Sequence, residues 1–105
     1  MKNYVIVYVT TANKSEAEKI AQALLKERLI ACANIIGPVS SHFHWEGKID
    51  TAEEYQMIMK SRADLFGELE QRVRALHGYE VPEVLAVAIV DGSEAYFDWM
   101  DSVLK

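Results

Sequence analysis

The sequence predicts an α+β fold in which two helices cover one face of a four-stranded antiparallel sheet and a third helix follows the last strand. Two short apolar segments, residues 4–9 and 84–90, are typical of strands. Two amphipathic segments that begin near Asn13 and Ser61 have helical spacing. Between them lie two long extended segments joined by one turn. The 105 residues, 50% of them hydrophobic and 26% charged, fit one globular domain, residues 1–105.

The first strand and the first helix have clear local signals. Tyr4 to Val9 consists of Val, Ile and Tyr, which favour a buried strand. Asn13 followed by Glu16 is a helix start of the capping-box type. Apolar side chains then recur at helical spacing, and the helix is expected to end near Arg28.

Residues 31–45 and 48–60 predict a hairpin with long arms, joined by a turn at Glu46-Gly47. Pro38 fits a strand only at an edge position or a bulge, because it cannot donate a ladder hydrogen bond. On the second arm, three side chains alternate toward one face: Tyr55, Met57 and Met59.

Ser61 with Asp64 predicts the start of the second helix, which buries Leu65, Leu69, Val73 and Leu76. Gly67 inside that helix costs roughly 1 kcal/mol relative to Ala, so we expect close packing there or a weak turn. Gly78 is expected to end the helix in a left-handed conformation.

The carboxyl-terminal part predicts one more strand and one more helix. Val84 to Val90 has no polar residue, which predicts a strand buried on both faces. After a turn at residues 91–93, apolar residues at helical spacing predict a last helix: Tyr96, Trp99, Met100 and Val103. The first six elements, β-α-β-β-α-β, follow the ferredoxin-like split β-α-β sandwich.

The predicted hairpin is longer than the helices that should cover it. Its shorter arm would reach roughly 43 Å, whereas the first helix covers only about 22 Å. Exposed strand edges and aromatic side chains such as Phe43 and Trp45 would then favour aggregation of a lone chain. We therefore expect a closed symmetric assembly in which hairpins pair with neighbouring sheets. The alternative is a bent hairpin that folds back on its own domain.

Charge and cysteine content exclude several classes of protein. Eleven Lys and Arg against 16 Asp and Glu give a net charge of −5, which argues against nucleic acid or an anionic membrane as a partner. The single cysteine, Cys32, excludes an intrachain disulfide and a multi-cysteine zinc site. After Met1 to Asn3, the apolar run Tyr4 to Val9 is too short for a signal-peptide core or a membrane span, so we expect a cytoplasmic protein.

Four spaced blocks, residues 29–35, 45–49, 54–60 and 77–83, together resemble the CutA divalent-cation-tolerance family over essentially the whole chain. The resemblance implies a homotrimer of ferredoxin-like protomers, close in architecture to the PII signalling proteins. It also implies an association with tolerance to copper and other divalent ions, with no established enzymatic activity and no obligatory cofactor. By similarity, clefts between subunits would be lined by Cys32, Trp45, Lys60, His77, Tyr79 and Glu83. The family usually has Pro or a second His where this chain has Gly78, so a tandem-His metal site is not carried over.

Four residues are candidate metal ligands: His77, Cys32, His42 and His44. The Cys32 thiolate suits copper or zinc, although it could equally pack as a small apolar residue between two alanines. His77 is a ligand by family analogy, or a helix-end residue favoured by the helix dipole. His42 and His44 share one face of a strand, so they could bind Cu(II) with Glu46 or a neighbouring chain, or could simply pack.

Acidic residues offer one further candidate site. Tyr79, Glu80 and Glu83 near Lys60 could form a pocket for a small anionic ligand, or a salt-bridged rim. Glu53 and Glu54 point to opposite faces of a strand, which is poor geometry for shared acid–base work. The expected function is therefore non-enzymatic, namely metal or small-ligand binding at subunit junctions. The alternatives are a structural assembly protein with no ligand and, with least support, a hydrolase that uses Lys60 and Glu83.

Overall fold

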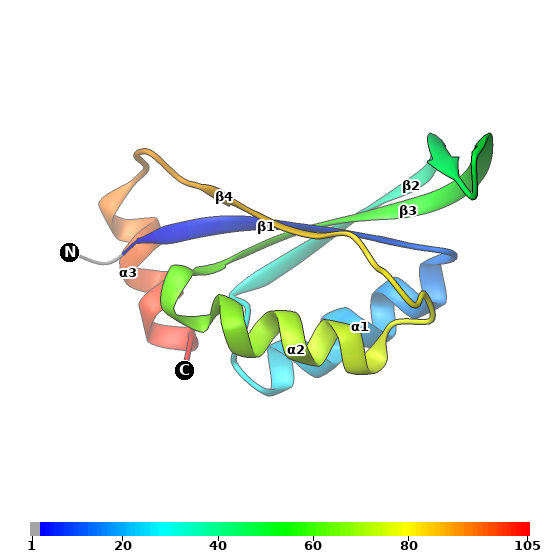
Figure 1. The fold of residues 1–105 in the computed structure, drawn as a ribbon. Coiled ribbons are helices and arrows are strands. Elements are labelled where there is room, and N and C mark those ends of the chain that lie inside the picture. Colours follow the sequence, from blue (N-terminus) through cyan, green and yellow to red (C-terminus); the bar gives the residue numbers. More distant parts are fainter. Residues whose placement is uncertain (1–2) are drawn as a thin grey trace.

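The computed structural model describes residues 3–105, so Met1 and Lys2, part of the expectation about the amino end, lie outside it. The strands and helices are β1 (Tyr4–Thr11), α1 (Lys14–Lys26), β2 (Cys32–Trp45), β3 (Lys48–Arg62), α2 (Phe66–Leu76), β4 (Val84–Ala88) and α3 (Glu94–Val103). The sheet order is β2-β3-β1-β4, and every pair of neighbours is antiparallel. Helices α1 and α2 lie on one face (Figure 1). The predicted element order and sandwich are confirmed.

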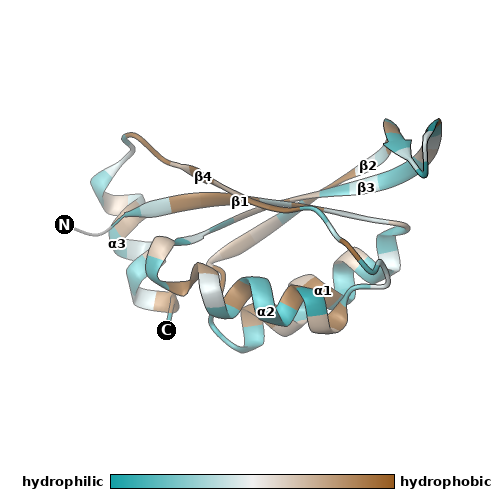
Figure 2. Ribbon diagram, viewed as in Figure 1, coloured by the Kyte–Doolittle hydropathy of each residue, from teal (hydrophilic) through white to brown (hydrophobic). Residues whose placement is uncertain are grey.

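The main core lies between the sheet and these two helices. Alternate residues of β1, Val5, Val7 and Val9, face the helices and are buried, as the strand period requires. Met57 and Met59 of β3 lie on the same face and are fully buried. Figure 2 shows apolar residues gathered along the strands and on the sides of α1 and α2 that face them.

The predicted start of α1 is confirmed, with one difference. The side chain of Asn13 accepts a hydrogen bond from the Glu16 amide at 2.8 Å. The Glu16 carboxylate does not return to Asn13, as a full capping box would require. It accepts instead from the amides of Ala12 at 3.4 Å and Gly78 at 2.8 Å. Glu16 thereby joins the start of α1 to the loop that follows α2.

The predicted hairpin is present, with its turn at Glu46-Gly47 and a bulge at Pro38. Glu46 and Gly47 have φ angles of 49° and 77°, the left-handed conformation of a tight two-residue turn. Pairing of β2 with β3 shifts between Ile36 and Val39, so Pro38 lies in a bulge on an edge strand. A side chain at Gly37 would overlap the ring of Tyr55, which is why glycine is needed there.

Beyond the bulge the hairpin curls rather than running straight (Figure 1). The radius of gyration is 14.3 Å, against about 13 Å for a compact domain of this length. Side chains in the distal half stay exposed, including 54% of Trp45 and 77% of Ile49. One chain therefore leaves the tip of its hairpin largely uncovered.

Two local expectations around α2 are wrong, and one of the two alternatives for Gly67 is excluded. Ser61 lies inside β3 and donates to the Leu29 carbonyl at 2.6 Å, because β3 stays paired with β1 as far as Arg62. Helix α2 begins at Phe66 after a short 3-10 turn, without a side-chain cap. Gly78 is not left-handed, since His77 already ends the helix with extended backbone, φ −81° and ψ 143°. Gly67 faces open space, which excludes close packing as its reason.

The expectation that residues 84–90 are buried on both faces is also wrong for one chain. The strand ends at Ala88 and lies at the sheet edge, with 57% of Leu85 and 50% of Val87 exposed. Helix α3, in contrast, does find its own apolar surface. Its Met100 is fully buried in a second cluster with Ala31, Leu65 and Leu104.

Candidate functional site

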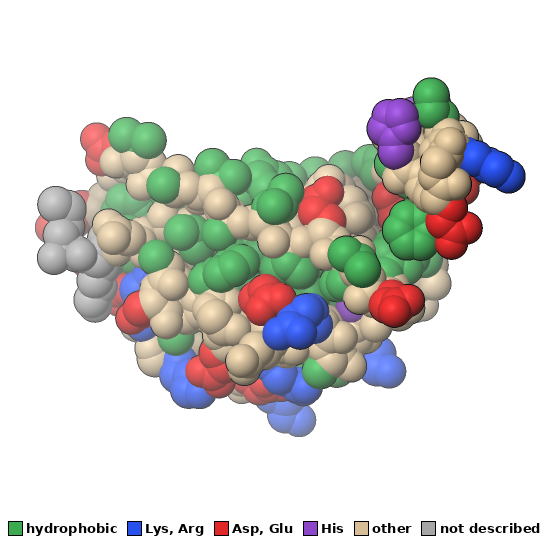
Figure 3. Space-filling model, in the orientation of Figure 1, with side chains coloured by type: hydrophobic (Ala, Val, Ile, Leu, Met, Phe, Trp, Pro, Cys, Tyr) green, Lys and Arg blue, Asp and Glu red, His purple; other side chains and the backbone are tan. Residues whose placement is uncertain are grey.

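The sheet face opposite α1 and α2 is apolar and largely open. Strand alternation and the pairing registers place six apolar side chains on it: Ile6, Tyr8, Ile36, Ile58, Leu85 and Val87. We call these six residues the open face. Figure 3 shows apolar side chains gathered along this side of the molecule, in the hollow between the hairpin tip and the turn before α3. Within residues 3–105, no helix lies over this face (Figure 1).

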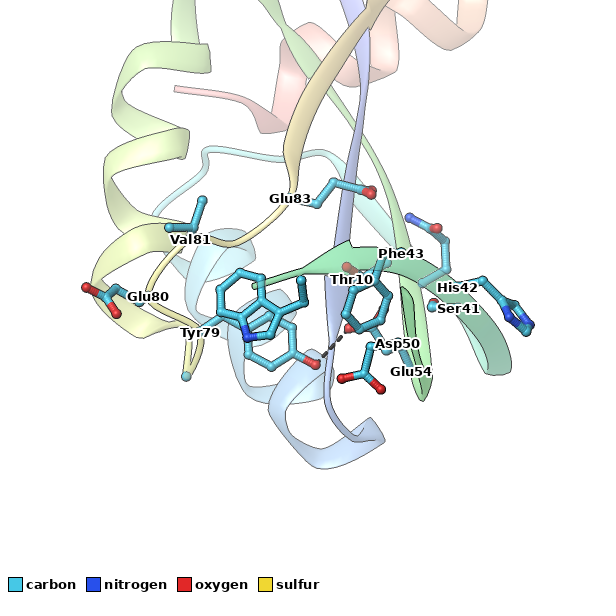
Figure 4. A pocket seen from close by; sticks show the side chains of 13 residues that line it. Thr10, Ser41, His42, Phe43, Asp50, Glu54, Tyr79, Glu80, Val81 and Glu83 are labelled. Atoms are coloured by element: carbon cyan, nitrogen blue, oxygen red, sulfur yellow. Dashed lines mark hydrogen bonds between the residues drawn. The ribbon is translucent and has the colours of Figure 1, made fainter. Parts of the chain in front are cut away.

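At one end of the open face, the hairpin tip and the loop of residues 78–83 border an open-sided pocket of about 770 Å³ (Figure 4). It is lined by Thr10, Ser41, His42, Phe43, Trp45, Asp50, Glu54, Gln56, Gly78, Tyr79, Glu80, Val81 and Glu83. Its volume lies within the roughly 300–1,000 Å³ that is typical of small-molecule sites. All of it is built by one chain.

His77 holds the loop against the end of β1. Its Nε2 lies 2.7 Å from the Thr10 carbonyl, which can only accept, so Nε2 carries a proton. Its Nδ1 accepts from the Tyr79 amide at 2.9 Å, so this nitrogen is unprotonated. The ring is therefore neutral and both nitrogens are occupied. A metal ion at His77 would have to displace one of these two partners.

Tyr79 and Glu54 form a partly buried polar contact in the pocket. The Tyr79 hydroxyl donates to Glu54 Oε2 at 2.7 Å, shown as a dashed line in Figure 4. Burial, and then the adjacent Glu54 carboxylate, raise the pKa of Tyr79 to about 12. Glu54 exposes only 7% of its surface and forms no ion pair within the described residues.

The lining of the pocket is acidic and aromatic. Four carboxylates, those of Asp50, Glu54, Glu80 and Glu83, belong to it, and no Lys or Arg does. None of the four is in a salt bridge within residues 3–105. This part of the surface therefore repels a small anion rather than attracting one.

The expected cleft residues fall into two groups. Trp45, Tyr79 and Glu83 line the pocket, and His77 lies behind Tyr79. Cys32 and Lys60 are absent from the pocket and face each other across β2 and β3.

Cys32 and Lys60 each have a polar partner in their own chain. The Lys60 ammonium donates to Asn34 Oδ1 at 2.9 Å, and Cys32 Sγ lies 3.5 Å from the Tyr96 hydroxyl. The hydrogen bond with Cys32 raises the pKa of Tyr96. The anion-pocket and hydrolase hypotheses need Lys60 and Glu83 in a single pocket. One chain does not bring these two residues together.

Two comparisons with known proteins agree with this architecture. The sequence profile of the CutA1 divalent ion tolerance protein family matches residues 5–103. The chain is 41% identical over 99 residues to the divalent-cation tolerance protein CutA of Archaeoglobus fulgidus, covering 94% of this chain and 96% of that protein. The chain belongs to the CutA1 family. It is also 40% identical over 96 residues to the chloroplastic protein CutA of Arabidopsis thaliana, covering 91% of this chain and 53% of that longer protein.

Solved structures extend the CutA1 likeness to three dimensions. The divalent cation tolerance protein CutA1 from Thermus thermophilus superposes with a TM-score of 0.95 at 35% identity. The match covers 97% of this chain and 99% of that one. The predicted family and fold are therefore confirmed together.

Within this CutA1 chain, His42 and His44 lie on the exposed outer part of β2. The Nε2 of His42 is 3.1 Å from the Ser40 hydroxyl, and Figure 4 shows its ring pointing away from the pocket. Residues 3–105 contain no group of three or more His, Cys, Asp or Glu arranged to hold a metal ion. Metal binding by Cys32, His42, His44 or His77 stays a prediction.

Glu54 is among the pocket residues that sequence reasoning did not assign to a site. It shares a strand face with Gln56, Ile58 and Lys60, and this parity was the available signal. In the same described residues, no helix is long and apolar enough to cross a membrane.

Proposed function

We propose that this CutA1-family chain acts as a PII-like homotrimer in the response to divalent cations such as copper, binding a metal ion or small ligand at its subunit junctions without catalysing a reaction. The observation that carries the proposal is that the expected cleft residues lie in two separate groups along the open face. Trp45, Tyr79 and Glu83 lie at one end, whereas Lys60 is four positions beyond the pocket residue Gln56 on β3, about 13 Å away.

A neighbouring chain is the simplest source of the missing contacts. Large apolar side chains on a free surface favour association, and 50% of Ile36 and 57% of Leu85 are exposed on the open face. The outer edges of β2 and β4 also carry unpaired backbone groups that another strand could use. Packing open faces around a three-fold axis would bury these side chains and bring the Lys60 of one chain toward the Trp45 and Glu83 of another.

The test is to measure mass and metal binding on the same preparation. Light scattering after size-exclusion chromatography should give three times the 11.9 kDa of one chain at micromolar concentration. Titration calorimetry with Cu(II) and Zn(II) should then give saturable heat, weakened in a Cys32→Ser or His77→Asn variant. A 12 kDa particle would contradict the assembly, and heats equal to dilution for both ions would contradict metal binding.

The second candidate is a structural assembly or anchoring protein with no ligand of its own. It is favoured by the two occupied nitrogens of His77 and by the lack of a metal-binding cluster within residues 3–105. A trimer that gives no heat with metal ions or nucleotides would support it over the first.

A cytoplasmic location belongs to the same proposal. The thiol of Cys32 is free, as expected in a reducing compartment. Among similar proteins, those of Arabidopsis thaliana and Oryza sativa are named chloroplastic, and a CutA structure from Archaeoglobus fulgidus is named periplasmic. Fractionation of cells with an antibody to this chain would decide its compartment.

A further inference from the structure

Three consecutive residues after α2 are each held by a different element of the chain. The His77 ring forms a hydrogen bond of 2.7 Å with a carbonyl at the end of β1. The Gly78 amide donates to Glu16 Oε2 on α1 at 2.8 Å. The Tyr79 hydroxyl donates to Glu54 on β3 at 2.7 Å. The loop of residues 78–83 therefore leaves α2 in a position that β1, α1 and β3 determine together.

The Glu16 carboxylate binds backbone amides rather than a cation. It lies in the first turn of α1, where the helix dipole favours a negative charge. Asn13 already caps this helix with its own side chain, so Glu16 is not needed as the cap. Within residues 3–105, Glu16 forms no ion pair, and its two oxygens accept from Ala12 at 3.4 Å and Gly78 at 2.8 Å. The shorter of these two bonds is the one that reaches the loop.

The loop lies unusually close to Glu16 at Gly78. A Cβ at this position would stand 2.7 Å from Glu16 Oε2, a separation that such atoms essentially never show. A hydrogen bond from an amide to a carboxylate is roughly twice as strong as one between neutral groups. The close approach and the charged acceptor together indicate that this contact fixes the place of the loop.

The charge of Glu16 also reaches the phenol of Tyr79. Burial is the largest cause that raises the pKa of Tyr79 to about 12, the Glu54 carboxylate is the next, and the charge of Glu16 adds to the rise. Glu16 thus acts on the same residue in two ways, through the backbone at Gly78 and through its electric field. Tyr79 is therefore a direct reporter of where the Glu16 carboxylate lies.

We propose that Glu16 is a positioning residue of the junctional site: it holds the Gly78 amide and thereby sets where the loop of residues 78–83 lies at the pocket. The role rests on the proposed function, because Tyr79 and Glu83 are the expected cleft residues that this loop carries. It does not depend on the number of chains, since Glu16 and Gly78 belong to the same chain. A structural role alone would change the stability of the chain and leave Tyr79 unaltered in the folded state.

The test follows Tyr79 in the folded full chain by NMR, with two readouts. The first is the pKa of its phenol, from the ring carbon resonances in an alkaline titration. The second is hydrogen exchange of its amide, which donates to His77 Nδ1 and does not contact Glu16 itself. Glu16→Ala should lower this pKa below about 12 and speed exchange about tenfold, the effect of losing a bond to a charged group. Both readouts unchanged would overturn the proposal, whatever happens to stability.

Matched variants separate position from charge. Glu16→Gln keeps an oxygen that can accept from the Gly78 amide, so exchange at Tyr79 should stay within about threefold of wild type, while the pKa of Tyr79 falls less than in Glu16→Ala. Glu18→Ala removes an exposed carboxylate from the same helix and should change neither readout. Equal effects of Glu16→Ala and Glu18→Ala would contradict the assignment.

A double-variant cycle tests the route through Gly78. Gly78→Ala displaces the Glu16 carboxylate without removing it, so it should speed exchange at Tyr79 as Glu16→Ala does. The double variant should lose no more protection than either single variant, because the two changes break one contact. Losses that add would show that Glu16 does not act through Gly78.

The outcome can be separated from that of the proposed function, because both Tyr79 readouts are made without a metal ion. A trimer that binds Cu(II) but whose Tyr79 is unchanged in Glu16→Ala refutes the positioning role and leaves the metal response standing. A chain that is monomeric, or that gives no heat with Cu(II), contradicts the proposed function. In such a chain, a shifted Tyr79 in Glu16→Ala still supports the hold of Glu16 on the loop.

Discussion

At the residue scale, the Tyr79–Glu54 contact makes stability depend on alkaline pH. The pKa of Tyr79 is about 12 in the folded chain, against about 10 in an unfolded one. The folded state therefore holds this proton longer, and its contribution to stability is complete below pH 10 and lost as pH rises from about 10 to about 12. In urea unfolding, Tyr79→Phe should show a smaller loss of stability over this interval than wild type.

Absorbance titration of tyrosinate near 295 nm checks the same contact directly. Tyr79→Phe should remove one group that titrates near pH 12. Glu54→Gln should lower the pKa of Tyr79 only in part, since burial is the larger cause of its rise. Glu53→Gln serves as the matched control and should leave the curve unchanged. A Tyr79 that titrates near 10 in wild type would show that the contact does not form in solution.

Two glycines make a matched pair with opposite expected effects. A Cβ at Gly78 would stand 2.7 Å from Glu16 Oε2 and break a hydrogen bond, so Gly78→Ala should destabilise by about 1 kcal/mol. A Cβ at Gly67 meets nothing within 4 Å on a helix, so Gly67→Ala should stabilise by about 0.5–1 kcal/mol. Chemical denaturation measures both. A Gly78→Ala variant that is as stable as wild type or more so would show that the Glu16–Gly78 contact adds no stability.

Resemblance identified Trp45, Tyr79 and Glu83 as site residues, but not what surrounds them. Glu54 is buried because Tyr79, 25 positions later in the chain, reaches its carboxylate. At Gly78, a Cβ would stand 2.7 Å from the carboxylate of Glu16, 62 positions earlier, which accepts from the Gly78 amide. Strand parity could place Glu54 on the same face as Gln56 and Lys60, but long-range contacts of this kind leave no periodic trace in a sequence, so neither contact could be predicted from it.

At the element scale, Arg62 fastens the end of β3 to the carboxyl terminus. It is 8% exposed and forms ion pairs with Asp64 and Asp101 at 3.0 and 3.1 Å. It also donates to the Lys105 carbonyl at 2.7 Å. Tyr4 donates to the same Asp101 at 2.7 Å, so β1, β3 and α3 meet at one point.

Removing the Arg62 guanidinium leaves Asp101 partly buried without this cation. Arg62→Ala should therefore cost about 1.5–3 kcal/mol through the loss of its charge-assisted hydrogen bonds, whereas Arg74→Ala, which breaks an exposed pair with Glu70 on α2, should cost below about 0.5 kcal/mol. Urea unfolding of the two variants, with helix content followed by circular dichroism, makes the comparison. Similar losses in both would mean that the Arg62 contacts do not hold α3.

Element boundaries were predictable where local chemistry decides them. Asn13 caps α1 and the Glu46-Gly47 turn closes the hairpin, because each depends on a few adjacent residues. Ser61 and Asp64 have the spacing of a helix start, but pairing of β3 with β1 continues to Arg62 and takes precedence. A strand extended by tertiary pairing overrides a weak local helix signal.

At the scale of the whole molecule, the apolar composition of β4 predicts burial but not which chain provides it. Within one chain, Leu85 and Val87 are half exposed or more. A run without polar residues says that a strand is covered on both faces in the working protein. In one chain, helices cover one face of the sheet, which meets half of that requirement. The proposed trimer would cover the other face.

The open face offers a clean test of that assembly, because Leu85 is 57% exposed and its replacement costs one isolated chain little. Leu85→Glu would place a carboxylate in the proposed interface in every subunit, where burying it unpaired costs several kcal/mol. Its mass should fall to that of one 11.9 kDa chain. Leu25→Glu, at a similarly apolar but outward position of α1, should keep the wild-type mass.

The thermal midpoint of wild type should rise with protein concentration, and that of Leu85→Glu should not, because only an assembling protein gains stability by mass action. If Leu85→Glu assembles as wild type does, the open face is not the interface, and the cleft would have to form along the strand edges alone.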